Sequence, residues 1–264
     1  MITNNPFSQL AEYIDPLFMK LFVIIMIIIV ILGTLIDMIH KKNVKYFFLN
    51  AKKSKEQAKR RISSSEKTKI ILKTFSSEIL TTSELGLGKR RIAHILGMYG
   101  TILFWIASVM MIFFYSVSGN NTPILYPILW HLGAIMTCIG GFWFWFFLRV
   151  DVSAEAHPWY RIVQADLFVL SLVISSSFGL LWSSFQYFNI NLWDTLFLIL
   201  FGISNLILFG GVYWSKFAHM FYKPGAAIQR NLAEADGSRD NLPEPSTQPK
   251  KFGLGIKREA PKHY

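Results

Sequence analysis

Five uninterrupted apolar segments constrain this chain more than any other feature of its sequence. A helix needs roughly 20 apolar residues to cross a hydrocarbon core about 30 Å thick, and a helix satisfies its own backbone hydrogen bonds there. The segments span about 17–38, 92–118, 122–148, 167–187 and 195–215, and the last four contain no Asp, Glu, Lys or Arg. The sequence therefore predicts an all-α membrane protein, a bundle of five transmembrane helices within residues 17–228.

The net charge of +11 is confined to one stretch of the 264-residue chain. Between Lys41 and Arg91 there are fifteen basic and four acidic residues, so the rest of the chain sums to zero. Loops rich in Lys and Arg stay on the cytoplasmic side. We therefore expect a short outer N-terminus at 1–16, a cytoplasmic loop at 41–91, a cytoplasmic C-terminus, and multi-pass insertion in the cell membrane.

Composition excludes several classes of protein. With 52% hydrophobic residues in long runs, the chain is not a soluble globular domain, and a nucleic-acid binder would be more polar. The single cysteine, Cys138, rules out a disulfide framework and a cysteine-ligated zinc or iron–sulfur site. Any metal would have to be held by histidines or belong to a bound cofactor.

Two segments outside the spans have a predicted character. Residues 229–264 are polar and contain several prolines, which predicts a disordered cytoplasmic tail. In the basic loop, 66–80 places Ile71, Phe75 and Ile79 on one face of a basic helix. This pattern favours contact with anionic membrane lipid, and docking of a cytoplasmic subunit stays open as the alternative.

Two histidines are predicted to lie at the same membrane depth. His94 follows Arg91 by three residues at the cytoplasmic end of the second span, and His219 follows Lys216 by three at the end of the fifth. Two neutral imidazoles in this arrangement could ligate one haem iron axially. The alternative is that both are interfacial residues bound to lipid headgroups or backbone carbonyls.

Other ionisable residues near the spans have simpler interpretations. We expect His131, alone on an apolar face of the third span, to be a hydrogen-bonded packing residue, with haem ligation as the alternative. His157 could be a substitute ligand or a quinone contact, although an ordinary loop residue is the simpler interpretation. Asp166 and Arg161 are candidates for proton exchange at a quinone site, but an ion pair of Asp166 with Arg161 or Arg149 is favoured.

Three short motifs resemble those of a known membrane family. Residues 70–105 combine an amphipathic loop helix with Arg90, Arg91, His94 and Gly100, and 157–181 have a polar start followed by small residues. The fifth span ends in a motif containing His219, Tyr222 and Pro224. These motifs resemble cytochrome b membrane subunits similar to the respiratory nitrate reductase gamma subunit and to the heterodisulfide-reductase-type membrane subunits.

The resemblance implies a haem b-containing electron-transfer subunit, with His94 and His219 as axial ligands of the haem nearer the cytoplasm. Such a subunit links the quinone pool to a cytoplasmic iron–sulfur partner and is not the catalytic subunit of its oxidoreductase complex. Members with two haems carry a further histidine deeper in each helix, at places corresponding to Phe104 and Phe201 here. We therefore expect one haem.

A second class of function needs no cofactor. The chain could be a membrane anchor that tethers a cytoplasmic partner through the basic loop and uses its histidines for packing. A small transporter is disfavoured, because the span number is odd, no inverted repeat is visible and no span interior is charged.

Overall fold

The computed structural model of the protein describes residues 1–85, 88–117, 121–150, 158–215, 217 and 219–238, apart from the side chains of residues 43, 84 and 219. Every regular element within these residues is a helix. Five are long and apolar enough to cross a membrane, which confirms the predicted all-α fold with five spans. Their bounds are α2 (Pro16–His40), α5 (Lys89–Phe114), α6 (Leu125–Trp143) continued by the π-helical η3 (Phe144–Leu148), η4 (Gln164–Asp166) leading into α7 (Leu167–Tyr187), and α8 (Asn191–Gly210) continued by η5 (Gly211–Tyr213).

The spanning helices form a bundle with an exposed apolar surface. Helix α2 begins at Asp15, whose side chain accepts a hydrogen bond from the backbone N–H of Leu17, with Pro16 in the first turn. Along α2, side chains such as Ile25, Ile28 and Ile31 are about half exposed. Apolar side chains exposed all along a spanning helix contact lipid, and the chain is a multi-pass membrane protein.

Glycines hold α5 and α6 in close contact. A Cβ added at Gly100 would lie 2.6 Å from the backbone nitrogen of Thr137, and one at Gly133 would lie 2.6 Å from that of Phe104. At Gly140 the added atom would lie 2.5 Å from the carbonyl oxygen of Ala93. Small residues at these points let the two backbones approach, which is how membrane helices pack tightly without a hydrophobic driving force.

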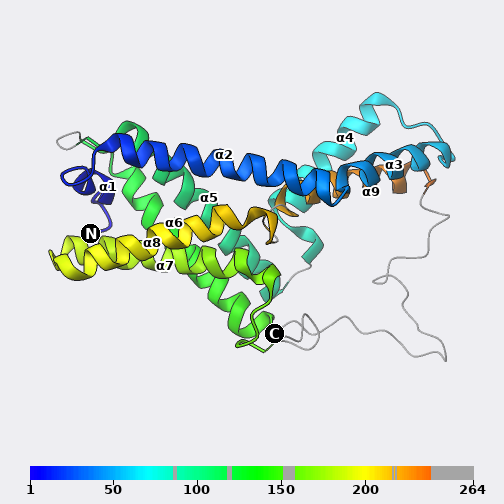
Figure 1. Cartoon of the computed structure of the whole chain (residues 1–264). Coiled ribbons are helices and arrows are strands. Elements are labelled where there is room, and N and C mark those ends of the chain that lie inside the picture. The colour runs from blue at the N-terminus through cyan, green and yellow to red at the C-terminus, as the bar shows by residue number, and fades with distance from the viewer. Residues whose placement is uncertain (86–87, 118–120, 151–157, 216, 218, 239–264) are drawn as a thin grey trace.

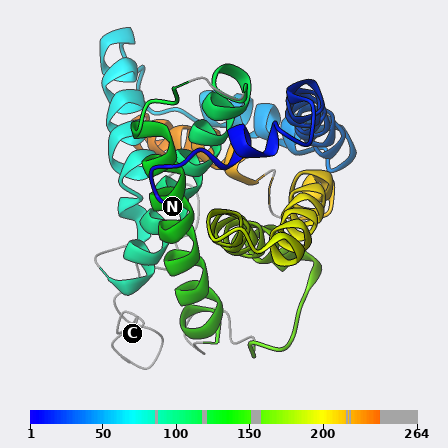
Figure 2. The ribbon, with the colours of Figure 1, turned by 90° about the vertical axis from the view of Figure 1, so that its left-hand side faces the viewer.

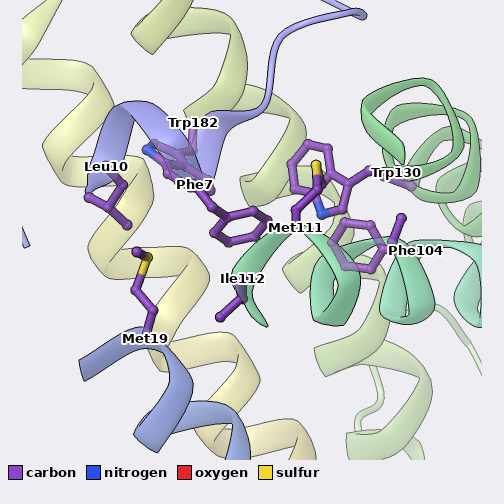
Figure 3. Close-up of a cluster of buried hydrophobic side chains, with 10 residues drawn as sticks. Phe7, Leu10, Met19, Phe104, Met111, Ile112, Trp130 and Trp182 are labelled. Carbon is purple, nitrogen blue, oxygen red and sulfur yellow. The ribbon is translucent and has the colours of Figure 1, made fainter. Parts of the chain in front are cut away.

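Aromatic side chains fill the bundle near its N-terminal end (Figure 3). Phe7, from the short helix α1 (Pro6–Leu10), inserts between the spans and lies edge-on to Trp130 and Trp182, at 6.0 and 5.4 Å between ring centroids. Phe104 and Met111 of α5 belong to the same buried cluster. The segment before the first span is therefore part of the core, although the sequence predicts only a short outer N-terminus.

A group of short helices packs together at the opposite end of the bundle (Figure 1). It consists of α3 (Asn43–Glu56), α4 (Ser64–Thr74), the π-helical η1 (Phe75–Leu80) and α9 (His219–Ala235), and we call it the helical cap. The 3-10 turn η2 (Ser83–Leu85) connects it to α5. The basic loop and the segment after the fifth span thus fold against each other.

Polar contacts hold α9 in the helical cap. Arg230 pairs with Glu78 at 2.5 Å, and the side-chain amide of Asn231 donates to Thr74 and to Glu78, both at 2.8 Å. The predicted disordered tail begins at residue 229, yet α9 is helical through Ala235. The packing against α4 and η1 accounts for this extension, and residues 239–264 lie outside the described part of the chain.

Candidate functional site

His94 lies in the second turn of α5, and its side chain is exposed. Near it, Arg91 donates through Nε to the carbonyl oxygen of Thr81 at 2.8 Å. These contacts place His94 where the helical cap joins the second span. The predicted depth of His94, at the end of its span next to the basic loop, agrees with this position.

His219 begins a helix of its own. The fifth span ends with η5 at Tyr213, and α9 starts at His219 and packs mainly against α3, α4 and η1. The sequence had placed this histidine at the end of the span. The side chain of His219 is outside the described part, so its pairing with His94 on one haem iron stays a prediction.

His131 is fully buried, and both of its ring nitrogens have partners. Nδ1 lies 2.8 Å from the carbonyl oxygen of Pro127, and Nε2 lies 2.9 Å from Oγ of Ser183. The ring also lies edge-on to Trp130 at 4.8 Å. This arrangement confirms the interpretation of His131 as a hydrogen-bonded packing residue, because Nδ1–H donates to a carbonyl and the Nε2 lone pair accepts from the Ser183 hydroxyl.

Phe104 and Phe201, at the places where the motif resemblance puts the deeper histidines of two-haem cytochrome b subunits, belong to a group of packed aromatic rings. The rings of Phe104 and Phe201 lie 6.2 Å apart, and Phe201 stacks on Trp182 at 5.8 Å. Phe104 is also 5.1 Å from Trp130. The described residues at this level are thus packed aromatic rings, and the number of haems stays a prediction.

Asp166 forms the predicted ion pair, and its partner is Arg149. The guanidinium is fully buried, pairs with both carboxylate oxygens, and lies 4.5 Å from the ring centre of Trp145. It also donates to the carbonyl oxygens of Pro158, at 2.8 Å, and of Arg161. Arg161 takes part through its backbone, while its side chain is exposed. His157 lies outside the described residues.

The ion pair with Arg149 is the interpretation of Asp166 that the sequence favours, and the structure contains it. The guanidinium donates to a carboxylate and to two carbonyls, so the buried charge is compensated. The Arg149 side chain thus links the end of η3 to the residues that lead into η4. The Asp166 carboxylate accepts from Arg149 and from the backbone N–H of Val163, and a role for Asp166 and Arg161 in proton exchange with a quinone stays a prediction.

A further buried carboxylate joins the first span to the helical cap, and the sequence analysis missed it. Asp37, in the last turn of α2, is 1% exposed, pairs with Lys41, and accepts a hydrogen bond from the Tyr222 hydroxyl at 2.8 Å. Tyr222 belongs to α9. The available signal was an acidic residue at the end of an apolar span, four residues before a lysine on the same helix face.

The described residues contain no group of three or more His, Cys, Asp or Glu side chains arranged to hold a metal ion. Comparison with known proteins finds no matching family, no similar curated protein and no similar solved structure. The resemblance to cytochrome b membrane subunits therefore stays a prediction from short motifs. Within the described residues, the surface that most resembles a binding site belongs to the helical cap.

Proposed function

We propose that this protein is a membrane anchor subunit that tethers a partner protein through its helical cap. The observation that carries the proposal is an exposed aromatic and basic face on α3. Phe48 is 64% exposed, and Lys52 and Lys55 follow it at four and seven residues, on the same side of the helix. We call Phe48, Lys52 and Lys55 the α3 face.

The position of α3 supports a protein partner for this face. Helix α3 continues the direction of α2 past the ends of the spanning helices (Figure 1). Its other side is fixed by α9, where Phe47 lies close to Gly225 and Gln229 bonds to the Phe47 carbonyl. An exposed aromatic side chain among lysines, outside the lipid zone, suits a partner surface that is apolar at its centre and acidic at its rim.

Purification of the full chain from its native membranes in a mild detergent tests this function. We expect a second protein to co-purify in comparable amount and to be lost when Lys52→Glu and Lys55→Glu are combined. The matched control reverses two exposed charges elsewhere in the basic segment, Arg61→Glu with Lys67→Glu, and should retain the partner. Equal retention by both variants, or no co-purifying protein with the wild type, would overturn the proposal.

Electron transfer through haem b between the quinone pool and an iron–sulfur partner is the alternative function. It is supported by the motifs around His94 and His219 and by the position of His94 beside the helical cap. The structure offers no observation in favour of a haem at the level of Phe104 and Phe201, which aromatic rings fill. A bound haem would supply one-electron transfer, whereas in the anchor hypothesis the chain holds only its partner.

A reduced-minus-oxidised optical spectrum of the purified protein separates the two functions. The anchor hypothesis predicts no haem absorption after expression with adequate haem. A haem spectrum that disappears in His94→Ala and in His219→Ala, and persists in His131→Ala, would establish the electron-transfer alternative. A haem spectrum unchanged in the first two variants would refute these ligands.

A further inference from the structure

The side of α4 and η1 that faces away from α9 is apolar and exposed. Leu72 is 63% exposed, Phe75 49% and Leu80 41%. Thr74 is buried and, with Glu78, makes the hydrogen bonds to α9. At 3.6 residues per turn, Leu72 lies roughly 160° around the helix axis from Thr74. One side of the helix therefore packs against α9, and the opposite side is exposed.

Lysines and hydroxyls flank the exposed apolar side chains. A shallow surface hollow on α4 is lined by Leu72 and Phe75 together with Lys69, Lys73 and Ser76. We call Lys69, Leu72, Lys73, Phe75 and Leu80 the α4 outer face. Its composition, apolar at the centre with cationic side chains at the edge, matches a phospholipid with an anionic headgroup.

Two hydrogen bonds hold the end of this face against α5. The hydroxyl of Tyr99 donates to the carbonyl oxygen of Leu80 at 2.8 Å, and Arg91 donates to that of Thr81. Tyr99 lies about 15 Å along α5 from Lys89, past the basic start of that span. Leu80 is therefore held beside the first three turns of the spanning helix α5.

The spanning helices do not cover the α4 outer face. Seen from the N-terminal end of the bundle, α4 projects to one side of them (Figure 2), and in Figure 1 it lies past their ends. Lys89 and Arg90 add two basic residues at the start of α5, the helix that follows the cap in the chain. The α4 outer face is thus exposed at the end of the bundle where the basic residues are concentrated.

From these observations we propose that the α4 outer face binds anionic phospholipid, with Leu72, Phe75 and Leu80 among the acyl chains and Lys69 and Lys73 at the phosphate. The face would orient the helical cap on the membrane surface. This inference does not depend on the proposed anchor function, because it concerns the opposite side of the cap from the α3 face. Under this proposal the amphipathic segment 66–80 contacts lipid and not a protein.

Fluorescence quenching by nitroxide-labelled lipids tests the proposal on the full chain in vesicles. A polarity-sensitive fluorophore is attached at Leu72→Cys in a Cys138→Ser background, and the control label is at Lys52→Cys on α3, a side chain that is 76% exposed. We expect quenching several-fold stronger at position 72 than at 52. We also expect it to be stronger in phosphatidylglycerol than in phosphatidylcholine vesicles, and to lose that difference when Lys69→Gln and Lys73→Gln are combined.

Equal quenching at the two positions would overturn the proposal and leave the α4 outer face for a protein. Strong quenching that is the same in phosphatidylglycerol and phosphatidylcholine vesicles, with or without the two lysines, would overturn the choice of anionic lipid.

A second measurement avoids the cysteine background. Wild-type protein purified in mild detergent should retain more bound phosphatidylglycerol than the Lys69→Gln, Lys73→Gln variant, and equal retention would contradict the proposal.

Discussion

At the scale of single residues, Arg149 stands out because its charged side chain is fully buried. A fully buried guanidinium needs partners that offset the loss of its hydration. Here Asp166, two backbone carbonyls and the ring of Trp145 are these partners. The sequence suggested the pair, since it named Arg149 and Arg161 as possible partners of Asp166. It could not choose between them, because the choice depends on which side chain the η3 turn directs inward.

Replacing Arg149 tests this compensation. Arg149→Met leaves the Asp166 carboxylate buried without its partner, and removal of one member of a buried pair typically costs about 3–5 kcal/mol. We expect a large fall in the thermal unfolding temperature of the detergent-solubilised protein. Arg161→Ala is the control, because Arg161 contributes only its carbonyl, and it should unfold close to the wild type. Similar stability of both variants would contradict the structural role of Arg149.

At the scale of elements, the sequence predicted the helices well and their junctions poorly. Apolar runs without charges identify spanning helices, because the bilayer allows few other backbone conformations. The fifth span ends at Tyr213, close to the predicted residue 215, but the sequence does not predict the separate helix α9 that starts at His219. Helix α9 itself looks like a polar tail in the sequence, and its partners, among them Glu78 and Thr74, lie more than 150 positions earlier in the chain.

Two glycines on the α5 and α6 pair provide a test of helix packing. Gly140→Ala places a methyl group 2.5 Å from the Ala93 carbonyl oxygen, so the helices must separate. Gly97→Ala, on the facing helix, would meet no described atom within 4 Å and gains about 1 kcal/mol of helix propensity. We therefore expect Gly140→Ala to lower the unfolding temperature and Gly97→Ala to hold or raise it. The opposite order would contradict the close packing of α5 on α6.

The helical cap should respond to acid through Glu66 at the start of α4. The hydrogen bond from Arg60, at 2.5 Å, lowers the pKa of the Glu66 carboxyl below its ordinary value. A carboxyl with a lowered pKa in the folded state contributes stability above its unfolded pKa of about 4.3 and loses it as the pH falls through the folded value. We expect the protection factors of amides in the first turn of α4 to fall below that pH.

Glu66→Gln is the matched variant for this titration. It removes the ionisable group while keeping a hydrogen-bond acceptor, so the protection factors in the first turn of α4 should be lower than in the wild type at neutral pH and nearly independent of pH. The effect should be small, because the pair is exposed to solvent. Wild-type protection factors in the first turn of α4 that stay constant from neutral pH down to pH 3 would contradict the role of this pair.

At the scale of the whole molecule, the five spans place the N-terminal helix and the helical cap at opposite ends of the bundle (Figure 1). The charge of the 41–91 loop predicts that the cap end is cytoplasmic. An epitope tag before Met1 should then bind antibody on intact cells, and one after Tyr264 only after permeabilisation. The reverse pattern would contradict the orientation, and tags on the same side would contradict five spans.

The sequence by itself determined the number of spans, their helical state and the end of the bundle that carries the charge. Each of these follows from composition along a single segment, because a bilayer selects for length and apolarity locally. Three outcomes were decided only by the tertiary structure. Phe104 packs against Phe201 inside the bundle, Asp166 pairs with Arg149, and the basic loop and α9 form one cap. Those outcomes depend on side chains from distant segments meeting in space, and no property of one segment specifies its partner.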